Sequence, residues 1–267
     1  MWLNLQDFGF KALWSPYFLI YVLILGFLYF LITRPYRHKF GGTDADRPSV
    51  KEQLYFYTGL LLLYIIKGSP LDLMAHITLS AHMFQLVMYL FVFPIFIIKG
   101  LPKWIWKKNY YAPMIKPALD FLTKPVISLP LFYGLFSLYH LPVIFNFTNS
   151  VPIAYTSMSI FLLIAAFIVS LPIVSPIEEL NKLSPLLKMV YVLASAVLIT
   201  PACAIIIFAK VPLYASYTDV IDQQLGGVIM KFTQEIVYAF FYISTFFKWF
   251  NQKEVSKIDP LPESVVK

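Results

Sequence analysis

Charged side chains are scarce in this chain of 267 residues, because only 13% are Asp, Glu, Lys or Arg while 59% are hydrophobic. Soluble domains carry about 25% charged residues, so an ordinary water-soluble fold is excluded. The mean hydropathy of +0.72 is typical of an integral membrane protein. We therefore expect this chain to fold within a lipid bilayer.

Cysteine is almost absent. The single thiol, Cys203, cannot form an intramolecular disulfide, and the chain has no CxxC motif. The sequence also has neither an HExxH zinc-protease motif nor an evident nucleophile and base pair. These absences predict that the protein is not an enzyme.

The positive charge that the chain does carry gives a formal net charge of +7. Its Lys and Arg residues concentrate in short links between apolar runs, above all in 34–51 and 99–124. This is the positive-inside pattern of membrane topology rather than a nucleic-acid footprint. We expect no nucleic-acid partner.

Seven apolar runs are long enough, at about 20 residues each, to cross a bilayer as helices. They cover residues 17–33, 54–69, 75–98, 125–147, 151–172, 186–209 and 226–249. The basic links place the N-terminus outside and the C-terminus inside. We predict an all-α bundle with one seven-helix transmembrane domain over residues 1–250 and a disordered cytoplasmic tail over 251–267.

Ionisable and polar side chains interrupt three of these runs near the predicted outer side. Such groups are costly in hydrocarbon, so each is by default a candidate functional residue. The candidates are Asp72, His76, His82, Met83 and Gln85 in the third run, His140 in the fourth, and Asp222, Gln223 and Met230 at the start of the seventh.

Helical spacing separates the candidates of the third run into two faces. His76 lies four residues after Asp72 and seven before Met83, so these three would share a face. His82 is about 9 Å from His76 along a straight helix and points elsewhere, with Gln85 beside it. One ion therefore needs donors from several helices, and His140 with Asp222 or Met230 can supply them.

Each candidate also has a purely structural interpretation. His76 can form an interfacial hydrogen bond, His82 an interhelical one, and Met83 can simply fill the core. His140 can cap carbonyls freed by a helix break before Pro142. Asp72 can serve as the N-cap of the third helix and orient His76 at the same time.

The chemistry of the donors narrows the identity of a bound metal. Imidazole and thioether without thiolate suit copper better than zinc, magnesium or calcium. We therefore expect His76, His82, Met83, His140 and Asp222 as metal ligands, with Asp72, Gln85, Gln223 and Met230 in supporting positions. Lys231 and Glu235, four residues apart in the last run, most simply form an intrahelical ion pair.

Three segments in this order resemble the signatures of the CtaG family, the seven-span assembly factors of caa(3)-type cytochrome c oxidase. They are KGSPLDLMAHITLSAHMFQ, YHLP and DQQLGGVIM. The resemblance implies a multi-pass protein of the bacterial cell membrane that acts with oxidase subunits and handles copper for a copper centre. The chain departs from the family pattern at Leu86, where many members have a further histidine.

Two other functions remain open from the residues. A transporter or channel for a metal ion or a small solute would have its site near the membrane midplane, at broken helices. A haem protein would need two histidines facing each other at one depth, and His82 with His140 is the available pair.

Overall fold

The structure is a computed structural model, and it describes residues 9–43 and 46–258. In this part of the chain the protein is an all-helical bundle. This confirms the all-α part of the predicted fold class. In chain order the helical segments are α1 (Gly9–Leu13), α2 (Pro16–Thr33), the 3₁₀ segment η2 (Arg37–Phe40), α3 (Val50–Gly68), α4 (Pro70–Ile77), α5 (Leu79–Val87), the π-helical segment η4 (Met88–Val92), α6 (Phe93–Gly100), α7 (Lys103–Tyr110), α8 (Ile115–Leu122), α9 (Pro125–Tyr139), α10 (Pro142–Ser150), α11 (Pro152–Val174), α12 (Pro185–Leu198), α13 (Thr200–Ile207) and α14 (Val220–Ile258).

Four helical stretches among the described residues are long and apolar enough to cross a membrane: Pro16–Thr33, Leu79–Gly100, Pro152–Val174 and Pro185–Ile207. The number rises to six if α3 with α4, bent by 44°, and α8 with α9, bent by 80°, each count as one span. α14, which carries Lys231 and Glu235 in its middle, is not among them. The seven spans and the N-out, C-in orientation thus stay predictions.

Several helix ends differ from the predicted ones. The third span begins at Leu79 instead of 75, because Thr78 is extended and separates α4 from α5. His76 therefore lies on a different helix from His82, and the argument from one continuous helix was wrong. α14 continues to Ile258, so its helix includes the first eight residues of the predicted disordered tail, whereas 259–267 lie outside the described residues.

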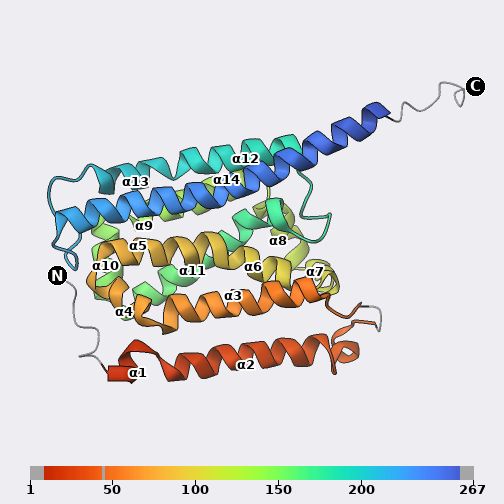
Figure 1. The fold of residues 1–267 in the computed structure, drawn as a ribbon, viewed down its shortest axis with the longest axis horizontal. Coiled ribbons are helices and arrows are strands. Elements are labelled where there is room, and N and C mark those ends of the chain that lie inside the picture. The colour runs from red at the N-terminus through yellow and green to blue at the C-terminus, as the bar shows by residue number, and fades with distance from the viewer. Residues whose placement is uncertain (1–8, 44–45, 259–267) are drawn as a thin grey trace, which may run out of the picture.

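Most of the helix breaks gather at one end of the bundle, here called the broken end, and the basic links lie at the other, the basic end (Figure 1). Proline explains two of the breaks. Pro70 and Pro142 each begin a new helix, and Ser69 and Leu141 before them are extended, as residues before proline tend to be. The break at Thr78 has no proline, so a contact with another part of the chain must stabilise it.

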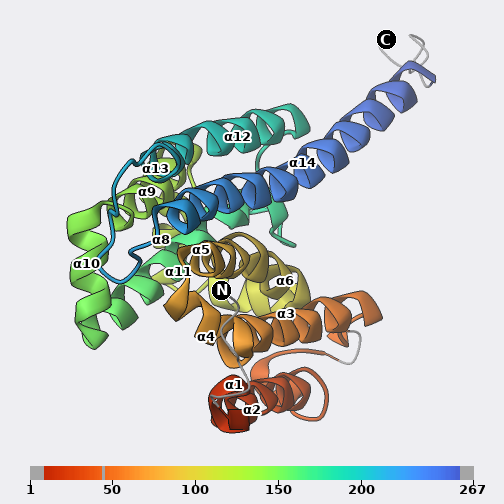
Figure 2. The same cartoon turned by 60° about the vertical axis from the view of Figure 1, so that its left-hand side comes forward.

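The hydrophobic core has two parts. The larger part lies among α5, α9, α11, α12, α13 and α14, and the smaller one among α2, α3 and α6. Figure 2 shows α2 at the periphery, beside α3, while α14 lies across α5 and α12. The candidate histidines His82 and His140 belong to the larger part, where both are buried.

Two adjacent glycines let α14 approach its neighbours closely, as their sequence predicts. A Cβ added at Gly226 would stand 3.1 Å from the backbone carbonyl of Leu79, and one at Gly227 would stand 2.8 Å from Ile207. By contrast, a Cβ at Gly134 in α9 meets nothing within 4 Å. The two glycines therefore fix the contact of α14 with α5 and α13.

We predict opposite effects for two matched glycine substitutions. Gly226→Ala should destabilise the protein by about 1–3 kcal/mol through overpacking against the Leu79 backbone. Gly134→Ala should stabilise it by about 0.5–1 kcal/mol, because alanine suits a helix interior better than glycine. Unfolding in mixed micelles measures both, and equal effects of the two substitutions would contradict the close contact.

At the basic end, an exposed hydrogen bond joins two links. The Tyr111 hydroxyl donates to Glu179 at 2.7 Å, connecting the segment after α7 with the segment between α11 and α12. This hydrogen bond holds the pKa of the Glu179 carboxyl below its ordinary value. Its stabilising contribution is therefore present at neutral pH and is lost as pH falls through the lowered pKa.

The corresponding prediction concerns pH. Tyr111→Phe should lower the unfolding temperature at neutral pH and leave it unchanged under acidic conditions, where Glu179 is protonated in both proteins. Thermal unfolding across this pH range measures the difference. A difference between the two proteins that stays the same in acid would show that the Tyr111 hydroxyl does not act through the ionised carboxyl group of Glu179.

Candidate functional site

The carboxylate of Asp222 caps the N-terminus of α5. Its Oδ2 accepts hydrogen bonds from the backbone N–H groups of Leu79, at 2.6 Å, and Ser80, at 3.4 Å. The Ser80 hydroxyl donates to its Oδ1. A negative charge at a helix N-terminus is favourable, and these donors would otherwise lack partners. Asp222 was predicted as a metal ligand, but the structure engages both of its oxygens in this cap.

The two glutamines after Asp222 fasten the link between α13 and α14. Gln223 is fully buried, and its Oε1 accepts from the N–H of Leu213 at 2.8 Å. The Gln224 amide donates to the carbonyl of Ala209 at 2.8 Å. Together with the two glycines, these contacts assign a structural role to the DQQLGG segment.

Two tyrosines of this link insert into the broken end and bond to backbone carbonyls there. The Tyr214 hydroxyl donates to the carbonyl of His140 at 2.8 Å, and the Tyr217 hydroxyl donates to that of Ala75 at 2.6 Å. Both tyrosines are buried. They bind the link between α13 and α14 to the helices that carry the histidines. The sequence did not predict this role, because both tyrosines lie in a link between helices.

His140 is fully buried at the break between α9 and α10, and its Nδ1 lies 2.7 Å from the carbonyl oxygen of Phe136. The carbonyl can only accept, so Nδ1 carries a hydrogen and the neutral ring leaves Nε2 unprotonated. This atom has no hydrogen-bond partner in the described structure. The Phe136 carbonyl also accepts from the N–H of His140, so it is not one of the carbonyls that the break before Pro142 was predicted to free.

His82 lies in α5, and Tyr139 contacts both His82 and His140. Its Nε2 is 3.3 Å from the Tyr139 hydroxyl, and the Tyr139 ring meets the His140 ring edge to face, with 5.1 Å between the ring centroids. Phe145 and Tyr217 flank the His82 ring. The structure thus brings the two histidines of different helices to one aromatic cluster.

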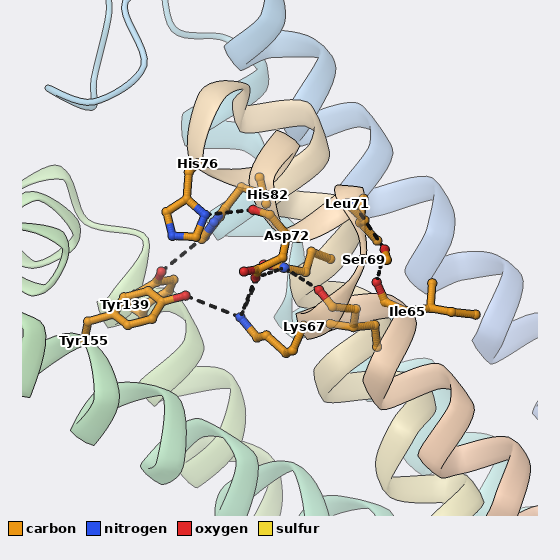
Figure 3. Close-up of polar contacts among 12 residues, drawn as sticks. Ile65, Lys67, Ser69, Leu71, Asp72, His76, His82, Tyr139 and Tyr155 are labelled. Atoms are coloured by element: carbon orange, nitrogen blue, oxygen red, sulfur yellow. Dashed lines mark hydrogen bonds and ion pairs between the residues drawn. The ribbon is translucent and has the colours of Figure 1, made fainter. Parts of the chain in front are cut away.

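A lysine at the end of α3 faces this cluster, and Figure 3 shows its contacts. The Lys67 ammonium lies 3.4 Å from both Gln85 Oε1 and the Tyr155 hydroxyl, and 3.8 Å from Asp72 Oδ1. The Gln85 amide donates to Asp72 Oδ1 and to the carbonyl of Ile66. Lys67 was missed in the sequence because it looked like the end of an apolar run.

A small cavity of about 20 Å³ lies between Lys67, His82, Gln85, Tyr139 and Tyr155. This volume holds a single water molecule, and the lining offers several polar partners for it. It is far too small for a haem. The geometry therefore does not favour the bis-histidine haem alternative.

The other candidates lie apart from the histidine pair or serve the fold. His76 is exposed on α4, where its Nδ1 bonds to the backbone carbonyl of Asp72 and not to its carboxylate. Ser69, not Asp72, is the N-cap of α4. Met83 and Met230 are fully buried in the core. Among the described residues, no three His, Cys, Asp or Glu side chains are placed to hold one metal ion.

The predicted ion pair in α14 is confirmed, with Lys231 Nζ 2.6 Å from Glu235 Oε1. Lys231 also donates to the carbonyl of Ala196 at 2.8 Å, near the end of α12. A cation near the C-terminus of a helix is favourable. The pair therefore joins α14 to the break between α12 and α13.

Residues 27–252 match the family model described as cytochrome c oxidase caa3 assembly factor. The chain belongs to this family. The match includes all three of the segments that carried the resemblance, and the apolar helices agree with a membrane protein. Searches among curated proteins and among solved structures found no match.

The Asp222 cap leads to a prediction. Asp222→Leu leaves two N–H groups of α5 without an acceptor and should cost about 1–3 kcal/mol of unfolding free energy. Asp222→Asn keeps one acceptor oxygen and should cost less. Glu178→Gln, at an exposed carboxyl group, is the control and should change little. Equal stability of Asp222→Leu and the control in micelle unfolding would contradict the cap.

Proposed function

We propose that this assembly factor handles copper as cargo for the caa3 oxidase and holds it with the imidazoles of His82 and His140. Membership of the assembly-factor family supports the role in oxidase maturation. The observation that carries the copper proposal is the buried, unpartnered Nε2 of His140, because an unprotonated imidazole nitrogen is a metal donor. Imidazole is among the ligands that copper accepts.

The fold constrains which other residues can take part. Asp222 is committed to α5 and His76 is exposed on α4, so neither belongs to the proposed pair. The backbone bond of His140 fixes its tautomer, as partners of metal-binding histidines commonly do. Met83 and Met230 are buried in the same core, and we propose them as candidate thioether donors for this site.

The charge beside His82 favours a monovalent ion. Lys67 borders the same cavity as His82, and Asp72 compensates only part of its charge across 3.8 Å. In a poorly hydrated interior, repulsion between the ammonium and a metal ion grows with the ion's charge. We therefore propose Cu(I) rather than Cu(II) as the cargo.

A transporter is the second candidate from the sequence, and broken helices are present here. However, most of the breaks lie at one end of the bundle, as Figure 1 shows, and not around a central site. The cavity beside His82 has room for a water molecule only. The assembly role is therefore the function that the observations support best.

We predict that the purified protein binds about one Cu(I) per chain, the number that one imidazole pair can hold. His82→Gln and His140→Gln should each fold and lose this copper. His38→Gln, in the 3₁₀ segment at the basic end, and His76→Gln are the matched histidine controls and should keep it. Elemental analysis after dialysis measures the content.

If the His82→Gln and His140→Gln variants both keep the wild-type copper content, these histidines are not the ligands. Loss of copper only in the His76 variant would instead move the site to α4. Circular dichroism of each variant shows whether its helices are intact.

A second prediction concerns the cellular role. Deletion of the gene should lower caa3 oxidase activity while the oxidase subunits are still synthesised, because only their maturation is impaired. The wild-type gene should restore activity and the His140→Gln gene should not. Normal oxidase activity in the deletion strain would contradict the assembly role, whereas full rescue by His140→Gln would contradict only the copper site.

A further inference from the structure

A second cavity, at the basic end, is lined by three lysines from three different helices. Lys99 comes from the end of α6, Lys188 from the first turns of α12 and Lys248 from α14. The cavity has a volume of about 320 Å³ and is bordered by Ser175 and Thr245 as well. It is remote from the histidines, which lie toward the broken end.

The positive charge of this cavity is not balanced by its own lining. No carboxylate is among the described residues that border it. Lys248 lies within electrostatic range of both Lys99 and Lys188, so its ammonium group repels each of theirs. Like charges brought together in a partly buried cavity destabilise a fold unless a counter-ion is bound.

The position of Lys99 is fixed before any ligand arrives. Its ammonium lies over the rings of Tyr55 and Phe241, 5.5 Å and 5.6 Å from their centroids. Lys188 is half-buried, whereas Lys248 is exposed. Two aromatic rings therefore position the Lys99 ammonium in the cavity, and the Lys248 side chain borders the cavity at the protein surface.

We propose that this cavity binds a phosphoryl anion, as inorganic phosphate or as the phosphodiester headgroup of an anionic phospholipid. A phosphoryl group offers multiple negative oxygens to several donors, and lysine binds it as a point charge. The Ser175 hydroxyl, which accepts from the N–H of Ile177, retains its hydrogen for such an oxygen. The volume exceeds that of one water molecule many times over.

The site would join α6, α12 and α14 at the basic end, because one anion contacts a lysine from each. This role is independent of copper and of the histidine pair. It concerns the part of the fold where the basic links lie, which is predicted to face the anionic cytoplasmic leaflet.

The test measures thermal unfolding of the full-length protein in nanodiscs of zwitterionic lipid, in buffer without phosphate. One arm adds inorganic phosphate against sodium chloride of equal ionic strength, and the other replaces part of the lipid with phosphatidylglycerol. We expect a concentration-dependent rise in unfolding temperature in at least one arm. A rise with phosphate identifies the free ion as a ligand, and a rise with phosphatidylglycerol alone identifies the lipid headgroup.

Lys188→Gln and Lys248→Gln should abolish this rise. They should also raise the unfolding temperature of the anion-free protein, because each removes repulsion, whereas loss of a merely structural lysine would lower it. Lys103→Gln, at an exposed lysine of the same end that does not line the cavity, should keep the wild-type response.

No rise in either arm for the wild-type protein would overturn the proposal. A rise that Lys188→Gln and Lys248→Gln both retain would overturn it as well, since the anion would then bind elsewhere. Because copper content is not read in this experiment, its failure leaves the proposed function standing, and failure of the copper test leaves the anion site standing.

Discussion

The bond between Asp222 and the first turn of α5 is the contact on which the broken end depends. The chain interrupts a helix at Thr78 without a proline, which exposes backbone N–H groups where water is scarce. A carboxylate 143 residues away from Leu79 accepts them. The glycine at 226 lets α14 come near enough for this bond to form. Without the cap, continuing the helix through Thr78 would satisfy the backbone better, and α4 would no longer diverge from α5.

Other polar groups at this end satisfy backbone carbonyls at this break and at the two breaks that proline explains. Since α4 turns away, the carbonyl of Ala75 needs a donor, which Tyr217 supplies, and Tyr214 does the same for His140. Gln85 satisfies the end of α3, and Lys67 is drawn between Gln85, Asp72 and Tyr155. These bonds use most of the polar atoms of the broken end. Among the described residues of this end, the Nε2 of His140 is a buried polar atom without a partner, and the proposed metal binding depends on it.

The sequence predicted the helical fold, most helix positions and the gathering of polar residues at one end, because hydropathy and proline act locally. It also predicted the Lys231 and Glu235 pair and the close approach at the two glycines, which depend only on helical spacing and residue size. It could not predict the break at Thr78, because a threonine is tolerated within a helix and the stabilising carboxylate lies far along the chain. For the same reason Asp222 looked like a ligand and Lys67 like a helix end, since only the tertiary contacts reveal their partners.

We propose that His82 and His140, which meet in one aromatic cluster at the broken end, are the copper ligands. X-ray absorption spectroscopy at the copper edge of the Cu(I)-loaded protein tests it most directly, because multiple scattering from imidazole rings counts the bound histidines. We expect two imidazoles per copper in the wild-type protein and one fewer in any copper retained by the His140→Gln variant. A copper coordination shell without imidazole in the wild-type protein would contradict it.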